Sequence, residues 1–243
     1  MLNETNYIKK GKTNIDKVID KMLPFAIDFY GKDKEDIIKK KIEETFFYSW
    51  TDETSLEIIN YLVGSDSLLK YTSNSKNNDD QVDAFYFSNN NRKVVIYKDL
   101  KQEINYFAFA HELFFHSVCQ SSTNGGNGIF FAHKNIYANE GWADLVARRI
   151  TDSMRMNVPL YKNQYFLALF VASIIEKNTD SSIISDMLVK QKYNIEDIFN
   201  LGKCDDWKEL SLLLDSVTKE NYSSTEVKVK KYLNNYKKRV VTK

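Results

Sequence analysis

The sequence is poor in the residues that interrupt secondary structure, with two prolines and eight glycines in 243 residues. So few breakers argue against a fold built from many short strands and tight turns. Lys, Glu, Ile and Leu are instead abundant, and this composition favours helices. A hydrophobic content of 43% excludes a disordered chain and is enough, at this length, for a substantial core. We therefore predict a mainly α protein.

Cysteine and net charge are also scarce. Cys119 and Cys204 are the only cysteines, too few for a disulfide framework or an all-cysteine zinc site, so a reducing compartment is expected. Lys and Arg number 34 against 33 Asp and Glu. This balance gives no reason to expect nucleic acid or an anionic membrane as a partner.

Long apolar segments are missing as well. The first residues, MLNETNYIKKGK, lack the apolar core of a signal peptide. The most apolar run, residues 165–175, is too short to span a bilayer. We predict a soluble cytoplasmic protein without a membrane span, and export by a specialised secretion system stays open.

Apolar periodicity predicts helices over most of the chain. Residues 84–87 and 93–98 are β-favouring and flank an Asn-rich turn, which is typical of a hairpin. We predict a single domain, 1–243, made of N-terminal helices to residue 64, a core of hairpin and metal site at 84–157, and C-terminal helices at 163–243. The predicted helices are residues 14–30, 34–48, 51–63, 102–120, 136–156, 164–177, 181–192, 195–200, 206–217 and 225–240.

The residues that indicate chemistry lie near three histidines, all between positions 111 and 133. Two of them bracket the segment HELFFH, residues 111–116. A catalytic zinc site needs neutral imidazoles on one side of a rigid element, beside an acid that takes a proton from water. The usual motif, H-E-x-x-H, spaces the histidines four apart. Five residues correspond to about 140° around a regular helix, so His111 and His116 converge only where the helix is wider, as in a π-bulge.

A second motif, NEGWAD at residues 139–144, begins the next predicted helix. Glu140 can supply an anionic third ligand. Asp144 lies one turn later on the same face, where its carboxylate can accept the free N–H of a ligand histidine. Gly141 allows another helix or the substrate to approach closely.

His-Glu…His on one helix and Asn-Glu-Gly-x-Ala-Asp on the next resemble the gluzincin clan of zinc metallopeptidases. The wider spacing is similar to the H-E-x-x-x-H of the dipeptidyl peptidase III family, although this chain is far shorter. The resemblance covers about residues 94–149 and implies a zincin-like domain, with an active-site helix followed by a glutamate-bearing helix. It implies one Zn²⁺ held by His111, His116 and Glu140, with Glu112 as catalytic base and Asp144 supporting a ligand. A hairpin fits too, because such peptidases keep a sheet edge beside the site for extended substrate.

Three further residues are candidates for contacts with substrate or transition state. His133 could be an alternative third ligand or a donor to an oxyanion, although a packed or loop histidine is the plainer interpretation. Tyr137 and Tyr161 could also serve as oxyanion donors. A pair of purely structural histidines, or a site that has lost its metal, remains the alternative for the motif as a whole.

These features predict a zinc-dependent peptidase that acts on a peptide or protein substrate, with Glu112 as general base. The main alternative is a regulatory or binding protein on a zinc-peptidase scaffold. A secreted effector or toxin peptidase with the same chemistry is the third hypothesis.

Overall fold

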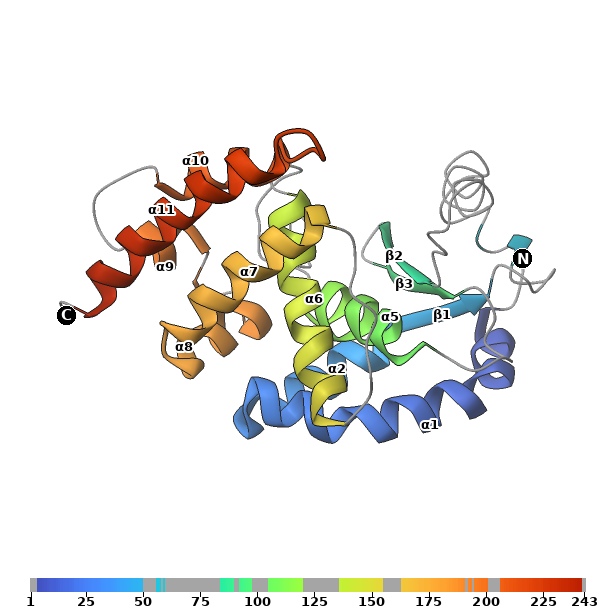
Figure 1. Ribbon diagram of the computed structural model, residues 1–243. Coiled ribbons are helices and arrows are strands. Elements are labelled where there is room, and N and C mark those ends of the chain that lie inside the picture. Colours follow the sequence, from blue (N-terminus) through green and yellow to red (C-terminus); the bar gives the residue numbers. More distant parts are fainter. Residues whose placement is uncertain are drawn as a thin grey trace.

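The computed structural model describes most of the chain, and the protein is mainly helical with one small sheet (Figure 1). The described residues are 4–49, 56, 57, 59, 84–89, 92–97, 105–119, 136–154, 163–190, 192, 193, 195–200 and 206–241. The predicted helix at 51–63 lies outside these residues except for 56, 57 and 59. None of the described helices has both the length and the hydropathy that a membrane span needs.

The N-terminal helix α1, Glu4–Tyr30, carries one buried stripe: Ile15, Val18, Met22, Ala26 and Tyr30. Their three- and four-residue spacing places them on the same face, which packs into the core. The helix stops where Gly31 takes a positive φ of 98°, a conformation that only glycine adopts without cost.

A short 3-10 turn, η1 (Lys32–Lys34), leads to helix α2 (Glu35–Glu43) and strand β1 (Thr45–Ser49). The prediction of helix through residue 48 is therefore wrong from Thr45 onward. The segment TFFYS is β-branched and aromatic, so it suits a strand better than a helix. Its short apolar run continues the spacing of the preceding helix, and periodicity cannot separate the two structures over so few residues.

Strands β2 (Ala84–Asn89) and β3 (Arg92–Tyr97) lie where the sequence predicts a hairpin. They pair antiparallel from Asn89 with Arg92 to Ala84 with Tyr97. Strand β1 pairs parallel with the other side of β3, which gives the order β1-β3-β2. Within the described part of the chain, β2 is consequently an edge strand.

The centre of the molecule is built from three consecutive segments: α5 (Tyr106–Ala110) with the π-helix η2 (His111–Ser117), then α6 (Ile136–Ser153) and α7 (Asn163–Lys177). Asn105 caps α5 by accepting hydrogen bonds from the backbone N–H groups of Phe107 and Ala108. Helix α6 packs against η2, α5, α1 and α7. In Figure 1 the sheet lies on one side of α6 and the C-terminal helices on the other.

The C-terminal part continues with α8 (Ser181–Ser185), the π-helix η3 (Asp186–Lys190), α9 (Ile195–Asn200), α10 (Asp206–Asp215) and α11 (Tyr222–Val241). These elements fall on the four helices predicted for this region, with small differences at the ends. Buried side chains from α1 through α11 form one continuous hydrophobic cluster. The segments that carry the chemical motifs lie inside this cluster, so their geometry is fixed by packing from both ends of the chain.

Candidate metal centre

The helix that carries the two histidines is wider than an α-helix over residues His111–Ser117. The backbone N–H of Val118 donates to the carbonyl of Leu113, five residues earlier, at 3.0 Å. A turn closed by hydrogen bonds between residues five apart brings such residues onto the same face of the helix. The spacing of His111 and His116 requires such a widening if the imidazoles are to meet, and the structure contains it.

The two imidazoles and one carboxylate converge on a single point. Nε2 of His116 lies 3.2 Å from Nε2 of His111. The Glu140 carboxylate, on α6, lies 2.9 Å from His111 Nε2 and 3.6 Å from His116 Nε2. One ligand atom from each of the three residues falls within 4.8 Å of the others. Two motifs on separate helices therefore form one cluster of potential metal ligands.

The distances within this cluster fit a tetrahedral metal ion. Zn²⁺ holds nitrogen and oxygen ligands at about 2.0–2.2 Å, so two ligand atoms at a tetrahedral angle are separated by about 3.3–3.5 Å. The nearest separations of 2.9, 3.2 and 3.6 Å straddle that value. Three electron-rich atoms that face one point also require a positive charge there, either a proton or a metal cation.

Asp144 holds His111 in a defined orientation. Its Oδ1 lies 3.0 Å from His111 Nδ1, and its side chain is almost fully buried. A carboxylate at Nδ1 keeps the proton on that nitrogen and leaves Nε2 free to act as a ligand. Asp144 thus occupies the position that its spacing from Glu140 predicts.

The local electrostatics favour a cation at this point. Burial lowers the pKa of His111, but its hydrogen bonds to Asp144 and Glu140 outweigh burial and raise that pKa well above its ordinary value. Burial alone would likewise raise the pKa of Glu140, yet the charge and hydrogen bonds of His116 and His111 lower it strongly. The two carboxylates thus stabilise positive charge beside His111, and a bound metal would displace the proton.

Glu112 lies next to the cluster but outside it. Burial raises the pKa of its carboxyl above the ordinary value, against the opposing effect of the nearby His116 and His111. The backbone N–H of Tyr86 donates a hydrogen bond to this carboxylate. Tyr86 belongs to the edge strand β2, and its ring stacks on His116 with centroids 6.0 Å apart. The edge of the sheet therefore borders the site.

Gly141 follows Glu140 and faces α7. A Cβ atom built at Gly141 would lie 2.4 Å from the carbonyl carbon of Ala168, far closer than atoms can pack. The close approach expected at this glycine is therefore made by helix α7. The absence of a side chain at Gly141 lets α7 pack directly against α6, the helix that carries Glu140 and Asp144.

The remaining predicted contacts are not part of the described site. Tyr137 is the second residue of α6, but the position of its side chain is not described, and His133 and Tyr161 lie outside the described residues. Sequence reasoning overlooked Tyr86, which contacts both Glu112 and His116. The available signal was its place on the strand that precedes the motif helix.

Comparisons with known protein families, curated proteins and solved structures returned no match to this chain. The class of site is therefore defined by its own geometry. Two imidazoles from a π-helix and one carboxylate from the following helix form a candidate metal centre with three protein ligands. A further carboxylate, Glu112, lies beside them.

Proposed function

We propose that this protein is a zinc-dependent peptidase with a zincin-like fold. The observation that carries the proposal is the convergence of His111, His116 and Glu140, with Glu112 held beside them by the sheet edge. Catalytic zinc sites use three protein ligands and leave a further position for water or substrate. A structural zinc site is normally closed by a fourth protein ligand, and no other His, Cys, Asp or Glu of the described chain joins this cluster.

His111, His116 and Glu140 would hold the ion. Two imidazoles and one carboxylate suit zinc, which accepts nitrogen and oxygen ligands in tetrahedral geometry. A zinc ion supplies two effects when bound: it lowers the pKa of a water molecule and polarises a carbonyl. The protein's own contribution is to orient these groups, and the contact between Asp144 and His111 does so for one ligand.

Glu112 is the proposed general base. It takes a proton from the attacking water and later returns it to the leaving amine of the cleaved peptide bond. A base that works near neutral pH should have a pKa closer to neutrality than an exposed glutamate, and burial raises the pKa of Glu112 in that direction. The Tyr86 N–H fixes one side of the carboxylate.

The edge strand β2 is the proposed platform for an extended substrate. Its position beside Glu112 and His116 would place a peptide that pairs with the strand next to the reacting groups. Backbone pairing to a sheet edge provides affinity without demanding one particular side chain. A peptide or protein segment in extended conformation is accordingly the expected substrate class.

The substitution Glu112→Gln tests this proposal. Gln can still accept the Tyr86 N–H but cannot take up a proton, so peptide cleavage should fall at least about 100-fold while zinc stays bound. The assay is mass-spectrometric detection of new termini in a mixed peptide library incubated with the zinc-loaded full chain. Glu176→Gln, on α7 and paired with Arg149, is the matched control and should cleave like the wild type.

Two results would contradict the proposal. Wild-type cleavage by the Glu112→Gln variant would exclude Glu112 as the base. Stoichiometric zinc in a wild-type protein that cleaves no peptide in the library would favour the non-catalytic scaffold instead.

A further inference from the structure

Within the described residues, the two backbone hydrogen bonds that close η2 go to the carbonyls on either side of Phe114. Val118 N–H donates to the carbonyl of Leu113 at 3.0 Å, and Cys119 N–H donates to the carbonyl of Phe115 at 2.7 Å. The first of these bonds joins residues five apart and the second joins residues four apart. Neither goes to the carbonyl of Phe114, which lies between the two acceptors. An unpaired carbonyl in a buried segment is costly, so a donor to this carbonyl stabilises the turn.

Tyr30 supplies the strong donor, and the Cys119 thiol, 3.8 Å from the same carbonyl oxygen, is a weaker one. The Tyr30 hydroxyl donates a hydrogen bond to the Phe114 carbonyl and lies 3.4 Å from Cys119 Sγ. The Tyr30 side chain is 1% exposed and Phe114 is fully buried, so water does not replace this contact. Burial raises the pKa of the Tyr30 phenol well above its ordinary value, and the nearby Cys119 raises it further. The phenol therefore keeps the proton that it donates.

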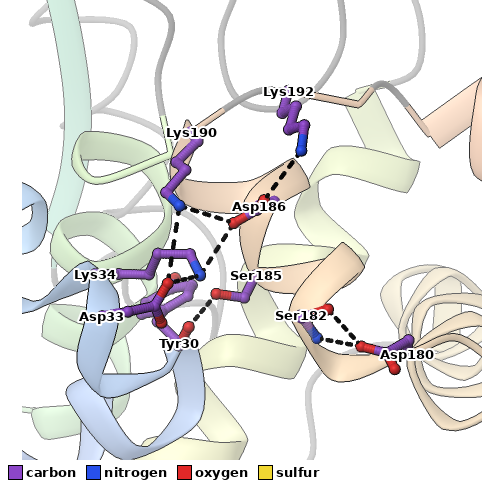
Figure 2. Close-up of polar contacts among 9 residues, drawn as sticks. All are labelled: Tyr30, Asp33, Lys34, Asp180, Ser182, Ser185, Asp186, Lys190 and Lys192. Carbon is purple, nitrogen blue, oxygen red and sulfur yellow. Dashed lines mark hydrogen bonds and ion pairs between the residues drawn. The ribbon is translucent and has the colours of Figure 1, made fainter.

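The end of α1 that carries Tyr30 is itself anchored (Figure 2). Ser185 Oγ donates to the backbone carbonyl of Tyr30. The buried ammonium of Lys34 lies 3.0 Å from Asp186, and Lys190 lies 3.2 Å from the same carboxylate oxygen. The Ser185 contact ties the end of α1 to α8, and the Lys34 contact ties the following turn, η1, to η3.

We propose that Tyr30 is a positioning residue for the metal centre: its hydroxyl donates to the buried Phe114 carbonyl at the end of the π-turn, and so stabilises the turn that brings His116 to His111 and Glu140. This inference rests on the proposed function for its biological purpose. The role differs from packing alone because it depends on the hydroxyl hydrogen. Removing only that group should relax the turn toward regular helical spacing and move His116 away from His111.

Tyr30→Phe is the test, because it keeps the buried ring. Co²⁺ replaces zinc as the probe, since its visible absorption reports four-coordinate geometry. We expect Tyr30→Phe to bind Co²⁺ about 10–100-fold more weakly, with a weakened four-coordinate band. Tyr236→Phe is the matched control: its buried ring carries a hydroxyl that lies 2.6 Å from Thr179 Oγ1, in a part-buried contact between α11 and the residues that follow α7, away from the cluster. This control should keep wild-type Co²⁺ binding even if its melting temperature falls.

A rescue experiment distinguishes the role of the hydrogen-bond donor at position 30 from that of the aromatic ring. p-Aminophenylalanine in place of Tyr30 retains an N–H donor and should restore the Co²⁺ spectrum. Wild-type Co²⁺ affinity and spectrum in Tyr30→Phe would overturn the inference, as would equal losses in Tyr30→Phe and Tyr236→Phe.

A measurement on the metal-free full chain keeps this result distinct from failure of the proposed function. Proton NMR of a chain with three histidines can detect the cross-relaxation between the rings of His111 and His116, whose centroids lie 5.0 Å apart. The signal should be present in the wild type and lost in Tyr30→Phe. If the wild type shows it but binds no metal, the proposed function fails and the role of Tyr30 stands. If the variant keeps it, the role of Tyr30 fails whatever the metal does.

Discussion

Replacing Gly141 with alanine gives a quantitative test of how the metal helix is packed. The new Cβ would lie 2.4 Å from the carbonyl carbon, 2.6 Å from the carbonyl oxygen and 2.7 Å from Cβ of Ala168. Carbon atoms in contact are normally separated by about 3.5–4.0 Å, so the two helices must part by about 1 Å. Because the obstacle is backbone, no side-chain rotation relieves it. We expect an overpacking cost near the upper end of the usual range, about 3 kcal/mol.

Helix propensity acts in the opposite direction. Alanine is favoured over glycine inside a helix by about 1 kcal/mol, which leaves a net destabilisation of about 2 kcal/mol. For a chain of this size, that corresponds to a fall of about 4–8 °C in melting temperature. Urea unfolding followed by circular dichroism measures the free energy directly. Zinc affinity should fall as well, because Glu140 is the adjacent residue on the displaced helix.

The sign of the change in unfolding free energy shows whether steric overlap or helix propensity dominates at position 141. Gly141→Ala with wild-type or higher stability would show that propensity dominates and that the close helix contact is wrong. Ala168→Gly provides a control, because it removes only the Cβ atom and leaves the carbonyl group of residue 168 in place. The cost of Gly141→Ala should therefore persist in the Ala168→Gly background.

Two more substitutions probe the contacts that support the site and the end of α1. Asp144→Ala should weaken zinc binding about 10–100-fold in a chelator competition, because His111 loses the partner that orients it; unchanged affinity would exclude that role. Hydrogen bonding to Lys34 lowers the pKa of Asp186 below its ordinary value. The ionised carboxylate therefore stabilises the fold at pH values above the unfolded-state pKa of about 3.9. This stabilisation is lost as the pH falls through the folded-state pKa. Asp186→Asn should accordingly be less stable than the wild type at pH 7, with a smaller difference at pH 3 by urea unfolding, and a difference independent of pH would contradict the assignment.

Local patterns were sufficient to predict much of the helical structure. Helix α9 begins at Ile195 and ends at Asn200 as its apolar spacing predicts, because a buried stripe and its flanking residues are all local in sequence. Strand β1 was not predicted because its structure depends on a partner that is distant in the sequence. Thr45–Ser49 becomes a strand only by pairing with β3, nearly fifty residues later, and no local pattern contains that partner.

In the candidate site, too, the local features could be predicted from the sequence and the long-range contacts could not. Its proposed ligands lie in two short motifs, and the spacing of His111 and His116 alone indicated where the helix must widen. The support for that widening could not be predicted. Tyr30 lies 84 residues before Phe114 in the sequence. Its position in the apolar pattern of α1 predicts that the side chain is buried, but not which carbonyl its hydroxyl contacts.

The zinc content of the purified full chain tests the central claim most directly. Mass spectrometry of the metals in the wild type, His116→Ala, Glu140→Ala and His133→Ala proteins, each after dialysis against zinc and then metal-free buffer, gives the comparison. We predict about one zinc per chain in the wild type and in His133→Ala, and little zinc in the other two, because three ligands hold the ion. A wild type without zinc, or full zinc retained by His116→Ala or Glu140→Ala, would contradict the proposed metal centre.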